Sequence, residues 1–219
     1  MQCAKPRMTP EPLSIASRFC GPSSSGNGGY VCGRLAAHLP GTVSVRLQAP
    51  PPLDTGLQVA VSGSAARLLQ GADVIAEAKT AVLDLMPPAC PSAAEAQAAS
   101  RAYPGFKHHP FPQCFVCGPQ RAAGDGLRIF TGPVASRAMV ACIWVPDTSL
   151  TKDDERVPEE FLWAALDCPG AFAVMPVPAG RALVLGEFCV RIDQHIAVGE
   201  ECIVIGWPLQ IEGRKRLAG

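Results

Sequence analysis

The run from residue 157 to residue 170, VPEEFLWAALDCPG, constrains the fold of this chain more than any other stretch. Its apolar residues recur every three or four positions, which is the spacing of one helix face. This apolar stripe consists of Phe161, Leu162, Ala165 and Leu166. Proline at the start costs a helix no hydrogen bond, and acidic side chains in the first turn suit the helix dipole. The run predicts an amphipathic helix, which packs best against a curved sheet.

A second line of residues on this predicted helix carries two carboxylates. Residues three and four apart stack above one another, so one face holds Glu160, Trp163, Ala164 and Asp167. Pro169 follows closely, so we expect the helix to end or kink near Asp167. A carboxylate there meets the negative end of the dipole and needs a partner or a raised pKa. Many such residues are simply solvated, but a poised carboxylate beside an apolar groove can act as a base.

Composition and charge exclude several classes of function. The 219 residues suffice for one large domain or two small ones. Nineteen basic residues balance nineteen acidic ones, so no net field attracts nucleic acid or an anionic membrane. No apolar stretch approaches the ~20 residues that a membrane-spanning helix needs. We therefore expect no nucleic-acid partner and no membrane partner.

The cysteines and the N-terminus indicate a cytoplasmic protein. Residues 1–10 lack the apolar core of a signal peptide, and we expect them to form a flexible leader. The ten cysteines are scattered, mostly in apolar contexts. In a reducing compartment such residues act as small buried hydrophobic side chains rather than as a disulfide framework.

Composition divides the chain into two halves. Residues 87–112 are rich in Pro, Ala and Ser, which predicts a linker with one short helix at most. It separates an N-terminal half, residues 11–86, from a C-terminal half, residues 113–219. The C-terminal half looks short, so we expect either that it lacks a final strand or that its sheet is completed in a different way.

The two halves repeat one plan. In the first, a glycine-rich turn precedes a short helix over residues 30–39, and in the second the acidic helix takes this place. Antiparallel strands are predicted after each helix by alternation and turn residues. They cover residues 43–47, 57–69 and 74–83 in the first half, and 181–192 and 201–207 in the second.

One helix followed by a meander of strands, twice over, resembles the hotdog fold of the acyl-CoA thioesterase-like superfamily, in its double-hotdog form. The resemblance implies an α+β protein with two antiparallel sheets, each wrapped around a central helix. One group of these enzymes opens its helix with His-Gly-Gly and places a catalytic Asp seven residues after the second Gly. In this chain Asp167 stands at the Asp position, but Pro158-Glu159-Glu160 replaces His-Gly-Gly. The first half has the similar opening Asn27-Gly28-Gly29, with Ala36 at the Asp position.

The resemblance implies an active site between the two helices. Backbone N–H groups around Gly28 and Gly29 would stabilise an oxyanion. Asp167 would activate water as a general base, or less readily attack as a nucleophile, and Glu160 is the second-choice carboxylate. The implied substrate-binding set is Asn27, Gly28, Gly29, Tyr30 and Trp163.

Three functions fit this resemblance. The first is hydrolysis of an acyl-CoA or related thioester, with coenzyme A entering only as part of the substrate and no further cofactor. The second is a non-catalytic acyl-CoA or acyl-thioester binding protein on the same fold. The third, a hydratase or dehydratase, needs a His-Asp pair that neither helix start supplies. Hotdog sheets commonly pair edge to edge, so we also expect a homo-oligomer.

The motif Cys114-Phe115-Val116-Cys117, near His108 and His109, raises the question of a zinc site. A closed zinc site needs four ligands, and its strong signal is two Cys-x-x-Cys pairs, or one pair with spaced histidines. The chain offers one pair and two adjacent histidines, which do not easily point to one metal. We therefore expect packed core cysteines and no metal. A thioredoxin-type redox pair also lacks its strand–motif–helix context.

Overall fold

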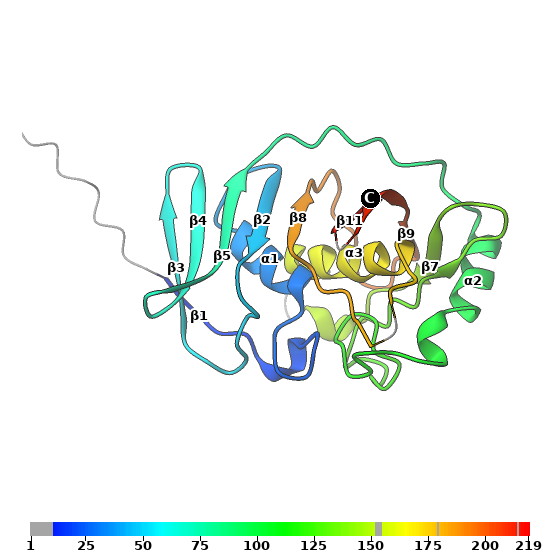
Figure 1. Ribbon diagram of the computed structural model, residues 1–219, viewed down its shortest axis with the longest axis horizontal. Coiled ribbons are helices and arrows are strands. Elements are labelled where there is room, and N and C mark those ends of the chain that lie inside the picture. Colours follow the sequence, from blue (N-terminus) through cyan, green and yellow to red (C-terminus); the bar gives the residue numbers. More distant parts are fainter. Residues whose placement is uncertain (1–10, 152–154, 179, 214) are drawn as a thin grey trace, which may run out of the picture.

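The computed structural model describes residues 11–151, 155–178, 180–213 and 215–219 (Figure 1). The predicted leader, residues 1–10, lies outside them. The chain forms an α+β structure whose strand pairings are antiparallel, as predicted. Within the described ranges, no helix has the length and apolar character needed to cross a membrane.

The largest sheet joins the two halves of the chain. Its six strands run in the order β1-β3-β4-β5-β2-β8. The strands are β1 (Glu11–Leu13), β2 (Val43–Leu47), β3 (Leu57–Ser62), β4 (Ala65–Gln70), β5 (Asp73–Thr80) and β8 (Glu187–Val190). The strand predicted over residues 57–69 is in fact the hairpin β3–β4, because Gly63, with φ of +59°, turns the chain back. Strand β8 comes from the second half and pairs with β2 of the first.

Two smaller sheets complete the second half. One has the order β6-β7-β9 and contains β6 (Gly132–Pro133), β7 (Val140–Trp144) and β9 (Cys202–Gly206). The other is the hairpin of β10 (Pro208–Glu212) and β11 (Lys215–Ala218), closed by two backbone hydrogen bonds between Trp207 and Gly219.

Among the described residues, three α-helices and three 3-10 helices accompany the sheets. They are α1 (Gly28–Ala36), α2 (Ala93–Arg101), α3 (Glu159–Ala173), η1 (Ser17–Phe19), η2 (Pro104–Phe106) and η3 (Thr148–Leu150). Helix α1 packs on β2, β4 and β5, while α3 packs on α1 and on β7, β9 and β11 (Figure 1). In the described part of the chain each of these helices is followed by four strands.

The predicted end of the acidic helix is wrong. Helix α3 continues through Pro169 to Ala173, so Asp167 lies inside the helix and not at its negative end. Proline inside a helix removes one backbone hydrogen bond, and burial of α3 offsets that loss. Phe161, Leu162 and Ala165 are buried as predicted.

The region predicted to be a linker is partly a packed element. Ser92 and Glu95 form a capping box that starts α2, and Ala96 and Ala99 are buried against β7. They form a small satellite core with Val134, Met139 and Ala141. Residues 81–92, which precede α2, run along the outside of the molecule from β5 (Figure 1).

Candidate active site

Helices α1 and α3 approach closely because α1 presents two glycines to α3. A Cβ atom on Gly33 would lie 2.7 Å from Glu160 Cα, and one on Gly29 would lie 2.6 Å from Asp167 Cβ. Gly29 and Gly33 are four residues apart and therefore share one face of α1. The line of α3 that carries Glu160, Trp163 and Asp167 faces these glycines.

The Asp167 carboxylate lies against the N-terminus of α1. Its Oδ2 accepts hydrogen bonds from the Gly29 backbone N–H at 2.9 Å and from Asn27 Nδ2 at 3.1 Å. The amide end of a helix is its positive end, which favours a carboxylate. Burial nevertheless raises the pKa of Asp167 to about 6, and the hydrogen bond from Gly29 works against that rise.

Asn27 positions both the helix and the carboxylate. It is the N-cap of α1, where its Oδ1 accepts from the Tyr30 backbone N–H at 2.9 Å while its Nδ2 donates to Asp167. The side chain is buried, with 3% of its surface exposed. Asn27, predicted to bind substrate, therefore uses both its amide oxygen and its amide nitrogen in hydrogen bonds within the protein.

The backbone amides of Gly28 and Gly29 differ in their partners. Among the described residues we find no hydrogen-bond partner for the Gly28 N–H, whereas the Gly29 N–H is bound to Asp167. Leu185 packs closely against Gly28: a Cβ atom on Gly28 would lie 2.8 Å from Leu185 Cβ. Leu185 therefore fills the space beside Gly28.

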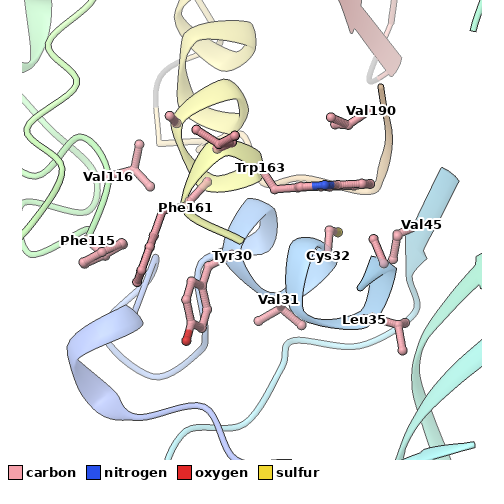
Figure 2. Close-up of a cluster of buried hydrophobic side chains, with 14 of the residues drawn as sticks. Tyr30, Val31, Cys32, Leu35, Val45, Phe115, Val116, Phe161, Trp163 and Val190 are labelled. Carbon is pink, nitrogen blue, oxygen red and sulfur yellow. The ribbon is translucent and has the colours of Figure 1, made fainter. Parts of the chain in front are cut away.

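The structure buries Tyr30 and Trp163 in the core instead of exposing them to a ligand (Figure 2). The Tyr30 ring stacks on Phe19 with a centroid separation of 4.2 Å, and the Trp163 ring meets Phe188 edge-on at 5.5 Å. Glu160 lies two helical turns before Asp167, about 10 Å along the axis. Of the predicted site residues, the structure therefore brings Asn27, Gly28 and Gly29 together with Asp167.

Three thiols lie beside this site, of which the Cys-x-x-Cys motif indicated Cys114 and Cys117 but not Cys168. Cys114, Cys117 and Cys168 are buried, and their sulfur atoms lie within 4.8 Å of one another. Cys168 follows Asp167 directly, and Cys114 Sγ lies 4.0 Å from Asn27 Nδ2. The Cys-x-x-Cys motif was the visible signal, but nothing in the sequence shows that α3 brings a third cysteine to it.

A hollow of about 210 Å³ lies elsewhere on the protein. Its walls are formed by residues of the 123–128 loop, by the end of β7 and by Asp147 and Leu150. None of the four site residues lines it, so we do not connect it with the chemistry of Asp167.

Comparisons with known proteins show that this chain is similar to some of them in fold only. No protein-family model matches the chain, and neither does any curated protein sequence. A tesB protein from Mycobacterium avium subspecies paratuberculosis has a TM-score of 0.57 at 14% identity, over 94% of this chain and 83% of that one. A protein from Thermobifida fusca YX, provisionally named thioesterase II, has a TM-score of 0.52 at 13% identity, over 92% and 83%.

A third solved structure is more distant. It is a conserved protein of unknown function with a hot dog fold from Alicyclobacillus acidocaldarius, with a TM-score of 0.47 at 10% identity, over 94% and 85% of the two chains. The likeness to the first two proteins shows that this chain shares their fold.

Proposed function

We propose that this protein is a double-hotdog hydrolase of an acyl-CoA or related thioester, with Asp167 as its general base. The observation that carries the proposal is the Asp167 carboxylate of α3, bound to the Gly29 amide at the N-terminus of α1. The fold shared with a tesB protein and with a protein named thioesterase II supports the same class of reaction. The double-hotdog form rests on the helix with four following strands in each half.

In the proposed reaction, the Asp167 carboxylate takes a proton from water as the water oxygen bonds to the thioester carbonyl carbon. The carbonyl oxygen becomes an oxyanion, for which the Gly28 N–H is the available donor, because the Gly29 N–H is already bound to Asp167. Collapse of this intermediate breaks the C–S bond. The thiolate leaves and takes up the proton from Asp167, which restores the carboxylate.

Three further expectations from the sequence belong to the proposal. We propose that the protein acts in the cytoplasm and that it self-associates through sheet edges. We propose no cofactor for the hydrolysis itself beyond the coenzyme A portion of the substrate.

The test is release of free thiol from a panel of short, long and aromatic acyl-CoA thioesters by the wild-type protein and by Asp167→Asn. Asn keeps the size of the side chain but is not a base, so we expect turnover to fall by roughly 10²- to 10⁴-fold. The matched control is Asp193→Asn, an exposed carboxylate in an ion pair with Arg191, which should leave turnover unchanged. Thermal melting of each variant reports whether it is folded.

Two results would contradict the proposal. Full hydrolysis by folded Asp167→Asn would mean that another group is the base. No turnover of any thioester by the wild-type protein, together with thermal stabilisation by acyl-CoA, would mean that the protein is the non-catalytic binding protein considered above.

A further inference from the structure

Three buried cysteines from two distant parts of the chain form a compact cluster. Cys114 and Cys117 lie in the loop between η2 and β6, and Cys168 lies on α3. Their exposed fractions are 2%, 4% and 8%. The Cys114 and Cys168 sulfur atoms are 3.9 Å apart, and all three sulfurs lie within 4.8 Å of one another.

These separations suit a tetrahedral zinc ion. With Zn–S bonds of about 2.3 Å, two thiolates on one zinc ion lie about 3.8 Å apart. Thiolate ligands select soft or borderline metals, and three of them exclude the hard cations Mg²⁺ and Ca²⁺. Cysteines that only fill a hydrophobic core need not cluster. Here, three sulfur atoms come together from segments about 50 residues apart in the chain.

His109 is the nearest candidate for a fourth ligand. Its Nε2 lies 3.3 Å from Cys117 Sγ. Its Nδ1 accepts a hydrogen bond from the Phe111 backbone N–H at 2.9 Å, so Nε2 carries the ring proton in this arrangement. Ligation through Nε2 therefore moves the proton to Nδ1 and breaks the bond from Phe111, while the ring closes on the three sulfurs. His108 is exposed, which answers the objection that two adjacent histidines cannot share one metal.

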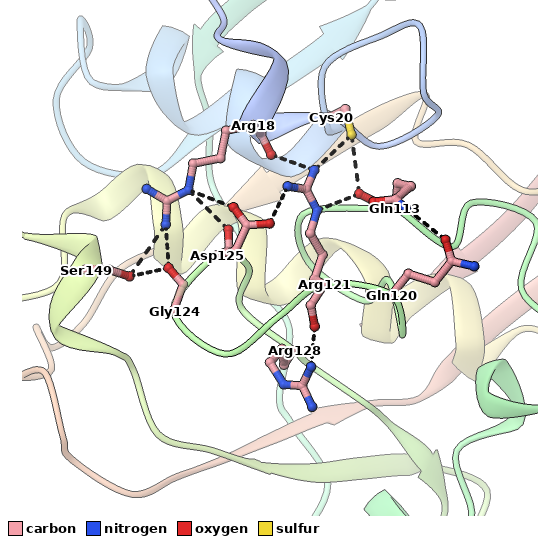
Figure 3. A network of polar contacts seen from close by, with 9 residues as sticks. All are labelled: Arg18, Cys20, Gln113, Gln120, Arg121, Gly124, Asp125, Arg128 and Ser149. Carbon is pink, nitrogen blue, oxygen red and sulfur yellow. Dashed lines mark hydrogen bonds and ion pairs between the residues drawn. The ribbon is translucent and has the colours of Figure 1, made fainter.

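The loop that carries the Cys-x-x-Cys motif is held in place by bonds that do not involve the sulfurs. The Phe115 backbone N–H donates to Cys20 O at 2.7 Å, and the Tyr103 hydroxyl donates to Cys117 O at 2.8 Å. Arg121 donates to Gln113 O at 2.8 Å and to Asp125 at 2.9 Å (Figure 3). Such support holds two of the three thiols in position before any metal binds.

We propose that Cys114, Cys117 and Cys168 bind a zinc ion, with His109 as the fourth ligand. A bound zinc ion would depart from our expectation of no metal. Four protein ligands leave no position for substrate, so the ion is structural and not catalytic. It ties the loop to α3 at the residue next to Asp167. Binding displaces the thiol protons to solvent, and no electron is transferred.

The first experiment measures the metal content of protein purified without a metal-affinity column, by inductively coupled plasma mass spectrometry. We expect about one zinc ion per chain. Cys168→Ser and Cys117→Ser should each lose the bound zinc. The matched control is Cys142→Ser, a fully buried cysteine on β7 outside the cluster, which should retain it.

The second experiment uses metal-stripped wild-type protein and remains informative if a cysteine variant fails to fold. Chelation should lower the melting temperature, and adding zinc should restore it. Cobalt(II) in place of zinc should give the intense sulfur-to-cobalt absorption of a thiolate site. His109→Ala should weaken zinc binding, whereas His108→Ala should not.

Specific results would overturn the proposal. Metal-free protein that shows neither cobalt absorption nor a zinc-dependent shift in melting temperature would remove the site. So would an intact mass that corresponds to a disulfide within the cluster. Unchanged zinc affinity in His109→Ala would remove His109 from the ligand set and contradict the four-ligand form. All these measurements are independent of thioester turnover, so they can fail without affecting the proposed function.

Discussion

At the scale of the residue, Asp167 lies against the positive end of the α1 dipole, whereas the sequence suggests the negative end of its own helix. The sequence places it near the negative end of its own helix, but α3 continues to Ala173. Its actual partners, Asn27 and the Gly29 amide, belong to the positive end of α1. The resemblance drawn from the sequence predicts that Asp167 faces the Asn27-Gly28-Gly29 opening, about 140 residues away in the chain, and the structure brings them together. It does not predict that the Gly29 N–H, expected to stabilise an oxyanion, is bound by Asp167 itself.

A single methyl group tests how closely the two helices must approach. Gly33→Ala should lower the free energy of unfolding by about 1–3 kcal/mol through overpacking, although alanine favours a helix. The added Cβ would lie 2.7 Å from Glu160 Cα and 2.8 Å from Trp163 Cβ, and backbone cannot move aside cheaply. Urea denaturation measures the change.

Gly170→Ala is the matched control for this prediction. It also lies in a helix, α3, but its added Cβ would meet only Ala218 Cβ, at 3.3 Å. We expect a change within about 0.5 kcal/mol. Equal destabilisation by the two substitutions would show that the close helix approach does not make Gly33 more sensitive than Gly170 to an added methyl group.

At the scale of the element, the periodicity of α3 predicts a helix but not which neighbour each face contacts. Leu166, one of the four stripe residues, is 42% exposed, while Trp163 and Ala164 of the other line are buried. A single amphipathic stripe presumes one packing partner, and α3 has two kinds: strands on one side and α1 on the other. The periodicity of α3 cannot predict its contact with α1, because that contact depends on glycines of α1.

The segment before β8 packs against Gly28 at the start of α1 through Leu185. Leu185→Ala should open space beside the Gly28 amide and change kcat/KM for thioesters several-fold, with KM moving more than kcat. Val184→Ala is the control, because that side chain is 70% exposed on the same segment. Steady-state kinetics across the thioester panel measures both. Identical constants for Leu185→Ala and wild type would mean that substrate does not reach Gly28.

At the scale of the whole molecule, the two halves are not independent units. The sequence predicts two halves and a linker, and the repeated plan is recognisable in α1 and α3 with their strands. However, β8 completes the sheet of the first half, and α3 packs against α1. Strand pairing between distant segments is set by the three-dimensional arrangement, which local alternation and turn residues do not encode.

Because β8 pairs with β2 and α3 packs against α1, we expect the two halves to stay together when the chain between them is cut. Residues 81–92 have no helix or strand, so a protease site inserted there should be cut without unfolding the protein. The fragments should stay together through β2–β8 and α1–α3 and co-elute on size exclusion. After separation in urea and mixing, they should recover the melting transition of the cut protein. Fragments that each fold alone and elute apart would contradict this.

The β2–β8 pairing also sets an order of events during synthesis. When the first half leaves the ribosome, the backbone groups along one side of β2 have no partner strand. Translation at about 5–20 residues per second delivers β8, about 140 residues later, after roughly 7–28 s. For that interval the nascent chain carries an open strand edge of the kind that pairs with other chains. A chaperone that shields this edge during translation should therefore increase the yield of folded protein.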